Sequence, residues 1–396
     1  DGKFYIVQSR PITTLQKEGI ESTIEDALTK EILNTKWSHL GKWIEPALAA
    51  EVWLEYGSIA QEFFTQKLDK KILYLNGDFF LSQHDSDVFQ AEGYEASKKH
   101  NKKFFQKIYT VVRVVTEEIS DKIKTVVSVV SFLEDYKKLT GVWMSLNNIA
   151  AGIEKYVQEV NPKSFTLTKG FLDEKPSTLQ QIDEMNELKE KIEKAIGKKF
   201  EKPEEIPIEY SDLVKAHIKK YEWLGTHHFN IGQLTTENLV QRMQQAKAKN
   251  HQDFVKEDDV ELTYLIWLLD LIGYVRFKAA ETSGYTTYYL KDHLIALAQK
   301  RGLTYEDIVE HTINEISSQN ITKEIAEKRK DNTGFYFNGT EHLLSIEQIK
   351  DCLDKLLKVE VQNDAELKGL SAQSGKVRGV VKIVIKQDQM KGFENG

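Results

Sequence analysis

Apolar side chains recur at three- and four-residue spacings along most of the chain, which is the period of an amphipathic helix. This pattern runs from about residue 25 to 155 and again from 210 to 330. The first such stripe comprises Trp37, Leu40, Ile44, Leu48 and Val52. Only six prolines occur in the chain, so long helices can continue unbroken. The pattern predicts a mainly α fold with a long helical central region.

Two short stretches interrupt or echo this helical pattern. The sequence Asn76-Gly77-Asp78 is a turn signal, which we expect between two helical stretches. Residues 110–115 and 125–130 share a run of valines that would suit a strand. Their flanks are rich in Glu, Lys and Ile, and we therefore expect both to be helical.

Residues 161–210 differ in composition from the helical stretches on either side. Four of the six prolines lie here, with a charged segment, Gln180–Lys194, that has the character of a helix. Proline ends helices, so the segment marks a break in the helical region. It is either an exposed insertion or the hinge between two helical lobes.

Strand-like patterns are confined to three short stretches. Residues 4–8 and the stretch that begins at Phe335 are short and rich in aromatic residues, and residues 377–385 alternate in period two. A helix is predicted at Ser345–Lys358, because Ser345 as N-cap and Gln348 three residues later form a capping box. β-structure is therefore expected mainly near the two ends of the chain.

Composition narrows the class of protein. The 396 residues carry a net charge of −7, which does not suit a nucleic-acid-binding surface. The single cysteine, Cys352, excludes an intrachain disulfide and fits a reducing cytosol, so a cytoplasmic location is expected. No apolar run reaches the roughly 18 residues of a membrane helix, and no membrane partner is expected. Because the chain starts at Asp1 and stops at Gly396, we expect it to be an internal fragment of a longer protein.

The first motif with chemical content is the stretch Tyr5–Thr13, which reads YIVQSRPIT. Period two along a strand places Gln8 and Arg10 on the same face, where an amide and a guanidinium suit phosphate and metal. An edge strand with a solvated Arg is the alternative. The stretch resembles the closing strand of the ATP-grasp domain of phosphoenolpyruvate synthase and pyruvate phosphate dikinase. That resemblance implies that Gln8 and Arg10 face ATP phosphates and Mg²⁺, and it places the rest of the nucleotide site before Asp1.

The second motif is Leu367–Ile385, in which Gly369, Gly375 and Gly379 punctuate a pair of strands. A generic hairpin is the alternative. The ordered set resembles the start of the swivelling phosphohistidine domain of the same enzymes. The phosphorylated histidine of that family lies further on, and none of the ten histidines of this chain is assigned its role.

The order of the two motifs resembles that of phosphoenolpyruvate synthase and rifampicin phosphotransferase. It implies an ATP-grasp end at 1–15, a helical central region at 16–360, and the start of the swivelling domain at 361–396. The whole enzyme would then use ATP and Mg²⁺ to phosphorylate a histidine and pass the phosphoryl group to a small-molecule acceptor such as pyruvate. A hydroxyl compound, as in the rifampicin enzymes, is the alternative acceptor, and a non-catalytic helical binding module is the alternative function. The fragment alone is expected to be inactive, since its partners are the missing domains.

The central region offers one candidate acceptor pocket around Arg276. At 100° per residue Arg276 falls on the apolar stripe of Leu262, Leu269 and Ile272, so we expect it to be buried. Glu281 lies too far round the same helix to pair with it. A carboxylate from another helix or a bound anion is therefore needed, and the two readings stay open. The candidate pocket residues are Arg276, Lys278, Glu281, Tyr285 and Tyr288.

A second candidate is the stretch Trp223–His228, which contains adjacent histidines. Adjacent residues point to different faces of a helix, which disfavours a shared metal ion, and no metal site is assigned. The stretch is predicted to be a packed aromatic loop, and it could also line an acceptor pocket.

Overall fold

The computed structural model of the protein describes residues 27–43, 45–54, 67–166, 175–232, 234–245 and 259–357. The described residues up to Leu356 belong to one compact unit, and only Leu357 falls outside it. Both end motifs lie outside the described residues, including Gln8, Arg10 and the alternating stretch 377–385. Their roles and the domain limits at 1–15 and 361–396 stay predictions.

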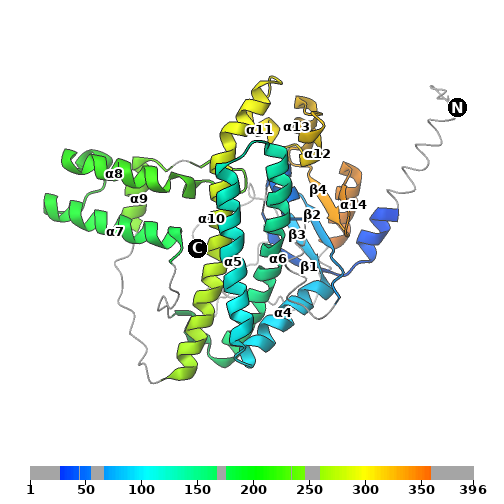
Figure 1. Ribbon diagram of the computed structural model, residues 1–396, viewed down its shortest axis with the longest axis horizontal. Helices are drawn as coiled ribbons and strands as arrows, with labels where there is room; N and C mark the ends of the chain where they lie inside the picture. The colour runs from blue at the N-terminus through cyan, green and yellow to red at the C-terminus, as the bar shows by residue number, and fades with distance from the viewer. Residues whose placement is uncertain are drawn as a thin grey trace, which may run out of the picture. The chain divides into compact units, whose positions relative to one another are not determined.

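Three long helices lie side by side and confirm the mainly helical prediction (Figure 1). They are α5 (Lys102–Lys124), α6 (Val129–Val160) and α10 (Val260–Gln299). Each begins at an N-cap side chain that accepts a backbone N–H of the first turn: Asn101, Ser128 and Asp259. Helix α10 has 40 residues and spans about 60 Å.

Helix α4 (Gln83–Lys98) packs against α6 at unusually close range. A Cβ atom at Gly152 would lie 1.9 Å from the carbonyl oxygen of Gln90, and one at Gly93 would lie 2.2 Å from that of Ile149. Only glycine fits at both positions, so the two glycines fix how closely these helices approach.

The helical region also contains a five-stranded antiparallel sheet, which the helical pattern did not predict. Its strands stand in the order β1-β3-β2-β4-β5. They are β1 (Trp37–Lys42), β2 (Ile72–Leu75), β3 (Asp78–Ser82), β4 (Gly334–Phe337) and β5 (Glu341–Leu343). The strand and turn predicted from Phe335 onward are confirmed as β4 and the turn that follows it, while the second strand of this hairpin, β5, was not predicted.

The turn predicted at Asn76–Asp78 is confirmed, but its setting is wrong: it joins strands β2 and β3. Asn76 and Gly77 have φ angles of 47° and 98°, the left-handed pair that suits a tight hairpin. Strands β2 and β3 are buried on both faces, so they show no period-two alternation, and the sequence pattern concealed them.

The predicted helical stripe from Trp37 to Val52 is also wrong. Trp37 and Leu40 lie in β1, which pairs with β3, while Leu48 and Val52 lie in the separate helix α2 (Ala47–Val52). Ile44 lies outside the described residues. Between them the backbone passes through Gly41 at a φ of 147°, so the spacing of the apolar residues was coincidental.

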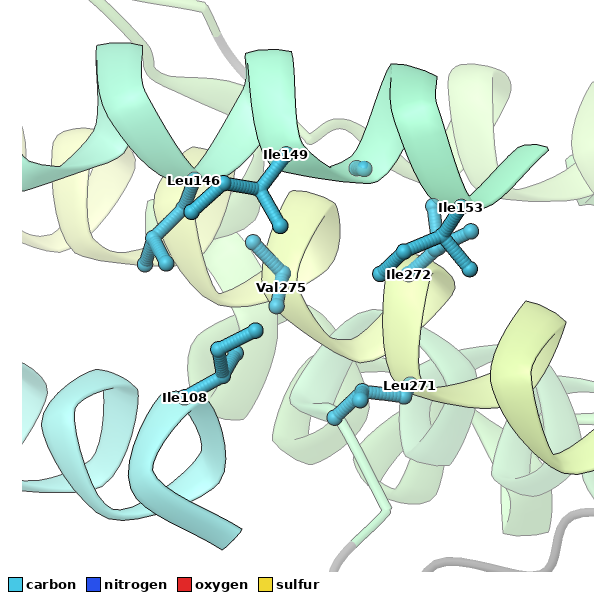
Figure 2. A pocket seen from close by; sticks show the side chains of 8 residues that line it. Ile108, Leu146, Ile149, Ile153, Leu271, Ile272 and Val275 are labelled. Atoms are coloured by element: carbon cyan, nitrogen blue, oxygen red, sulfur yellow. The ribbon is translucent and has the colours of Figure 1, made fainter. Parts of the chain in front are cut away.

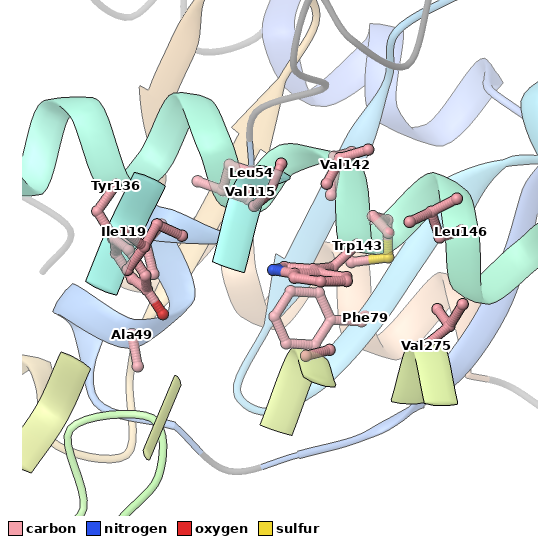
Figure 3. Packing of buried hydrophobic residues seen from close by; sticks show 14 of the residues in the cluster. Ala49, Leu54, Phe79, Val115, Ile119, Tyr136, Val142, Trp143, Leu146 and Val275 are labelled. Carbon is pink, nitrogen blue, oxygen red and sulfur yellow. The ribbon is translucent and has the colours of Figure 1, made fainter. Parts of the chain in front are cut away.

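The two faces of the sheet contact two different apolar clusters. Ile72, Tyr74 and Phe79 face the main cluster, which they share with α4, α5, α6 and α10. Figure 3 shows Phe79 of β3 and Trp143 of α6 in that cluster. Leu73 and Phe80 face the smaller cluster beneath α14 (Ile346–Leu356) and the helical turns at 27–34. The sheet is therefore an internal layer between helices.

A third apolar cluster joins α7 (Ser177–Ile196), α8 (Ile208–Tyr221) and α9 (Thr236–Gln245). The charged helix predicted at Gln180–Lys194 is confirmed as α7. The proline-rich segment 161–210 thus contains α7 and the first residues of α8, which belong to a small cluster with its own core. Short 3₁₀ turns accompany it: η1 (Pro162–Thr166), η2 (Pro203–Glu205) and η3 (Glu222–Gly225).

The remaining elements are short helices that follow α10. They are α11 (Tyr305–Ile308), α12 (Ile313–Ser317), α13 (Lys323–Arg329) and α14. The predicted capping box of α14 is confirmed: Ser345 N–H donates to Gln348 Oε1 at 2.9 Å, and Gln348 N–H donates to Ser345 Oγ at 3.3 Å. Of the two valine-rich echoes, residues 110–115 are helical in α5, whereas 125–128 form the connection to α6, so the helix predicted there was wrong.

Candidate functional site

Helix α10 carries a run of buried polar residues in its middle, which we call the polar segment (residues 278–287). Apolar residues precede it in the same helix, at Leu271 and Ile272. Its buried polar members are Lys278, Glu281, Thr282, Ser283, Thr286 and Thr287. Buried polar groups need hydrogen-bond partners. These side chains are therefore expected to bond to the parts of the chain that pack against α10.

The stretch 223–230, which we call the His228 loop, crosses α10 at Gly284. The Thr226 hydroxyl lies 2.7 Å from the Gly284 carbonyl oxygen. A Cβ atom at Gly284 would come within 2.5 Å of the Thr226 carbonyl oxygen. The loop therefore touches the helix backbone directly, and a glycine at position 284 makes this contact possible.

Two consecutive residues of this loop have left-handed backbones. His228 has a φ of 49° and Phe229 a φ of 58°, which is uncommon for residues other than glycine and is strained. The polar segment holds both peptides: His228 N–H donates to Ser283 Oγ at 2.8 Å, and Phe229 N–H donates to Thr287 Oγ1 at 2.9 Å. The loop conformation is thus held by hydrogen bonds as well as by packing.

The His228 imidazole forms a short hydrogen bond with the carboxylate of Glu45, which precedes α2. Nδ1 lies 2.6 Å from Oε1, with the Glu45 side chain 7% exposed and that of His228 20% exposed. Asn230 Nδ2 lies 3.4 Å from the other oxygen of Glu45, and the Trp53 ring lies 5.1 Å from the imidazole. A carboxylate and a histidine 183 residues apart in sequence are thereby joined at the edge of the polar segment.

Buried acidic and phenolic groups surround Glu45. Tyr74 O–H donates to the Glu45 carbonyl oxygen at 3.2 Å, and burial raises the pKa of Tyr74. Tyr305 of α11 donates to the Phe229 carbonyl oxygen at 2.9 Å. Burial also raises the pKa of Glu310, whose carboxylate accepts the Ala47 N–H at 3.3 Å. Groups from four separate parts of the chain thus converge here.

Arg276 does not take part in this site, and its predicted burial was wrong. Its side chain is 47% exposed and forms a two-pronged ion pair with Glu154 of α6. Of the two readings, the structure supports the pair with a carboxylate from another helix. Leu262 and Leu269 of the predicted stripe are themselves only partly buried, because the fully buried face of α10 runs through residues such as Leu268 and Val275. Arg276 therefore lies outside that face.

The other four predicted pocket residues lie along the polar segment and near η3. Lys278 Nζ lies 3.8 Å from Glu281 Oε2, and Glu281 Oε1 accepts the Thr178 N–H at 2.7 Å. A carboxylate beside the N-terminus of a helix interacts favourably with the helix dipole. Glu281, although it belongs to α10, thus anchors the first turn of α7. Tyr285 packs edge-on against Trp223 in η3, and Tyr288 hydrogen-bonds to Glu222. The structure therefore places Tyr285 and Tyr288 against η3 and the start of the His228 loop. Lys278 and Glu281 instead contact each other, and Glu281 also holds the start of α7.

Asp69, His84 and Asp85 are close enough together to hold a metal ion, but the ligand atoms of His84 and Asp85 are engaged in hydrogen bonds. Asp85 accepts the N–H groups of Asp69 and Lys70 at 2.7 and 2.9 Å. His84 Nε2 lies 2.9 Å from the Lys67 carbonyl oxygen, which requires the proton on that nitrogen. This cluster shapes the loop before β2, and we assign no metal ion to it.

A small apolar cavity lies between α5, α6 and α10 (Figure 2). Its volume is about 10 Å³, and its lining is aliphatic, with Ile108, Leu146 and Leu271 among its residues. Ligand pockets are far larger and carry polar groups. The cavity is therefore a packing defect and not an acceptor site.

Sequence reasoning found the histidine pair but not its partners. Glu45, Ser283, Thr287 and Tyr305 were not predicted. The run of Thr, Ser and Gly at 282–287, inside an otherwise apolar helix, was an available signal for the polar segment. Glu45 carried no local signal.

Comparisons of the chain with protein-family models, curated proteins and solved structures found no significant match. None of the described helices, α10 included, is both long enough and apolar enough to cross a membrane.

Proposed function

We propose that this chain is the helical, acceptor-binding part of a phosphotransferase of the phosphoenolpyruvate-synthase class. The observation that carries the proposal is the order of its motifs: the YIVQSRPIT stretch at Tyr5–Thr13 precedes a helical unit, and the glycine-punctuated stretch Leu367–Ile385 follows it. The mainly helical unit between them supports this order.

In the proposed scheme an ATP-grasp domain binds ATP and Mg²⁺, with Gln8 and Arg10 facing the phosphates. A histidine on the swivelling domain receives a phosphoryl group and carries it to the helical part, in the cytoplasm. A mobile carrier suits this chemistry, because positioning and electrostatics dominate phosphoryl transfer and the two sites need different surroundings. The His228 loop and the polar segment are the acceptor side of the scheme.

Pyruvate is one acceptor that the resemblance implies, and a hydroxyl compound of the rifampicin type is the other. The Glu45–His228 pair favours the hydroxyl compound, because a carboxylate-oriented imidazole is a group that accepts a hydroxyl proton. A helical binding module without catalysis is a proposal of another class, and it predicts no phosphorylated intermediate.

The test is phosphoenzyme formation by the full-length protein. With Mg²⁺ and ATP, intact-mass measurement should show one added phosphoryl group on a histidine, whereas the 396-residue chain alone should show none. Arg10→Ala should slow this step by about 100-fold, because Arg10 stabilises transferring charge. Arg113→Ala, a change at an exposed arginine of α5, serves as the control and should have no effect. A full-length protein that takes up no phosphoryl group would support the binding module instead.

A further inference from the structure

We propose that Nε2 of His228 is the general base that removes the proton from a hydroxyl group of the acceptor, with Glu45 as its orienting carboxylate. The inference deepens the proposed function and rests on it. It commits to the acceptor class: an organic compound that receives the phosphoryl group on a hydroxyl oxygen.

The hydrogen bond to Glu45 determines the tautomer of His228. An ionised carboxylate only accepts hydrogen bonds, so Nδ1, 2.6 Å from Glu45 Oε1, carries a proton. In the neutral imidazole the lone pair then resides on Nε2. Among the residues that the structure describes, none forms a hydrogen bond with Nε2. The His228 side chain is one-fifth exposed, so the ring is not sealed from an incoming group.

A histidine with a purely structural role has a different arrangement in the same fold. His311 is fully buried, and its Nδ1 lies 2.8 Å from the Asp307 carbonyl oxygen. Its Nε2 lies 3.0 Å from the backbone nitrogen of Thr322. Both ring nitrogens of His311 thus bond to backbone, whereas His228 has a carboxylate on one nitrogen and an available lone pair on the other.

The backbone under His228 supports a positioning function. Two consecutive left-handed residues are strained, and such strain persists only where the surroundings over-determine it. Ser283, Thr287 and Tyr305 supply hydrogen bonds to the peptides of His228 and Phe229. Three side chains from two helices therefore hold the backbone that carries His228, while Glu45 orients the imidazole ring itself, and a base that must meet one hydroxyl requires such positioning.

The step balances as follows. The acceptor oxygen forms a bond to the phosphorus of the phosphohistidine, and the P–N bond breaks with its electron pair returning to the carrier ring, which is protonated on its other nitrogen and so leaves as a neutral imidazole. The hydroxyl proton passes to Nε2 of His228. Glu45 stabilises the resulting imidazolium, which then releases the proton to water. The Trp53 ring, 5.1 Å from the imidazole, provides an apolar surface beside the base for the body of the acceptor.

The experiment separates the two half-reactions in the full-length protein. His228→Asn removes the ring but suits the left-handed backbone, because Asn tolerates that conformation. His227→Asn is the matched control, since His227 is the exposed neighbour. We expect all three proteins to form phosphoenzyme equally. Discharge of the purified phosphoenzyme to rifampicin, the hydroxyl probe, should fall by at least about 100-fold in His228→Asn and stay at the wild-type rate in His227→Asn. Glu45→Gln should give an intermediate loss.

Several outcomes overturn the inference. Phosphoenzyme that forms normally and discharges at an unchanged rate in His228→Asn defeats it while the proposed function stands. So does discharge of the wild type to pyruvate only. A wild type that forms no phosphoenzyme defeats both.

If neither probe accepts the phosphoryl group, diethyl pyrocarbonate decides, because it adds to an unprotonated imidazole nitrogen. On the 396-residue chain we expect rapid carbethoxylation of His228, slowed in Glu45→Gln. An unreactive His228 beside a reactive His227 would show that Nε2 is not available as a base.

Discussion

Arg276 and Glu154 join α10 to α6 through two parallel hydrogen bonds. Nη1 lies 2.6 Å from Oε1, and Nη2 lies 2.9 Å from Oε2. The geometry is that of a bidentate pair, but the Arg276 side chain is 47% exposed and that of Glu154 is 30% exposed. Solvent therefore weakens the attraction, and the pair is a surface clamp between two long helices.

Arg276→Met is expected to lower the free energy of unfolding by only about 0.5–1 kcal/mol, because the pair is solvated. Urea unfolding measures this, and a double-mutant cycle with Glu154→Gln isolates the pair. Arg113→Met is the control: its pair with Glu117 is longer, at 3.9 Å, and more exposed, so a smaller loss is expected. Unchanged stability together with a raised KM for the acceptor would instead favour the substrate-site reading of Arg276.

Gly284→Ala is expected to displace the His228 loop. The new methyl group would lie 2.5 Å from the Thr226 carbonyl oxygen, and backbone must shift to relieve that contact, at about 1–3 kcal/mol of stability. Gly273→Ala in the same helix has nothing within 4 Å of its new methyl group and should stabilise by about 0.5–1 kcal/mol. Thermal unfolding of both variants checks the prediction. Equal effects of the two substitutions would contradict a tight loop contact at Gly284.

Glu51 is expected to make stability fall as the pH rises. It is 2% exposed in α2, where its carboxylate lies 3.7 Å from Lys137 Nζ and accepts the Ile313 N–H at 2.7 Å. Lys137 also pairs with Glu341 of β5. Burial, reinforced by the negative charge of Glu341, raises the pKa of Glu51 from 4.5 to about 8.

Between these two pKa values the folded chain holds a proton that the unfolded chain has lost. Stability should therefore be highest below the unfolded pKa and fall through neutral pH, by up to about 1.4 kcal/mol per pH unit. Urea unfolding from about pH 5 to about pH 9 should show this slope, and Glu51→Gln should remove it. Glu324→Gln is the control, because pairing with Lys328 lowers the pKa of Glu324 and places its titration below this window. A slope that persists in Glu51→Gln would reject the assignment.

Ser345→Ala is expected to destabilise the start of α14 by about 1 kcal/mol, because it leaves the Gln348 N–H without its cap. Ser345→Asp retains an acceptor at the same position and should be near neutral. Chemical unfolding of the two variants provides the measurement. A loss of similar size in both variants would mean that the hydroxyl of Ser345 does not act as the cap.

Local features of the fold could be predicted from sequence. The capping box of α14 involves two residues three positions apart, and the charged helix α7 shows its period within 20 residues. Asn76-Gly77 also identified a turn. Such signals depend on backbone geometry within one or two turns of chain, which the local sequence determines.

The internal sheet was hidden for a physical reason. Strands β2 and β3 are covered on both faces by helices, so consecutive apolar residues, 72–75 in β2 and 79–81 in β3, erase the period of two. In β1 the apolar residues happened to match a helical spacing. Only pairing with β3, which lies more than 35 residues away along the chain, decided in favour of a strand.

The candidate site is a product of tertiary structure. The sequence alone identified the adjacent histidines and their aromatic surroundings. It could not show that Glu45 would meet His228 across 183 residues, or that Ser283 and Thr287 would hold the loop. Arg276 shows the same limit in reverse: periodicity placed it on a buried stripe of α10, whereas in the structure its side chain is 47% exposed beside Glu154. Which atoms of a helix face are covered, and by what, depends on neighbours that local spacing does not encode.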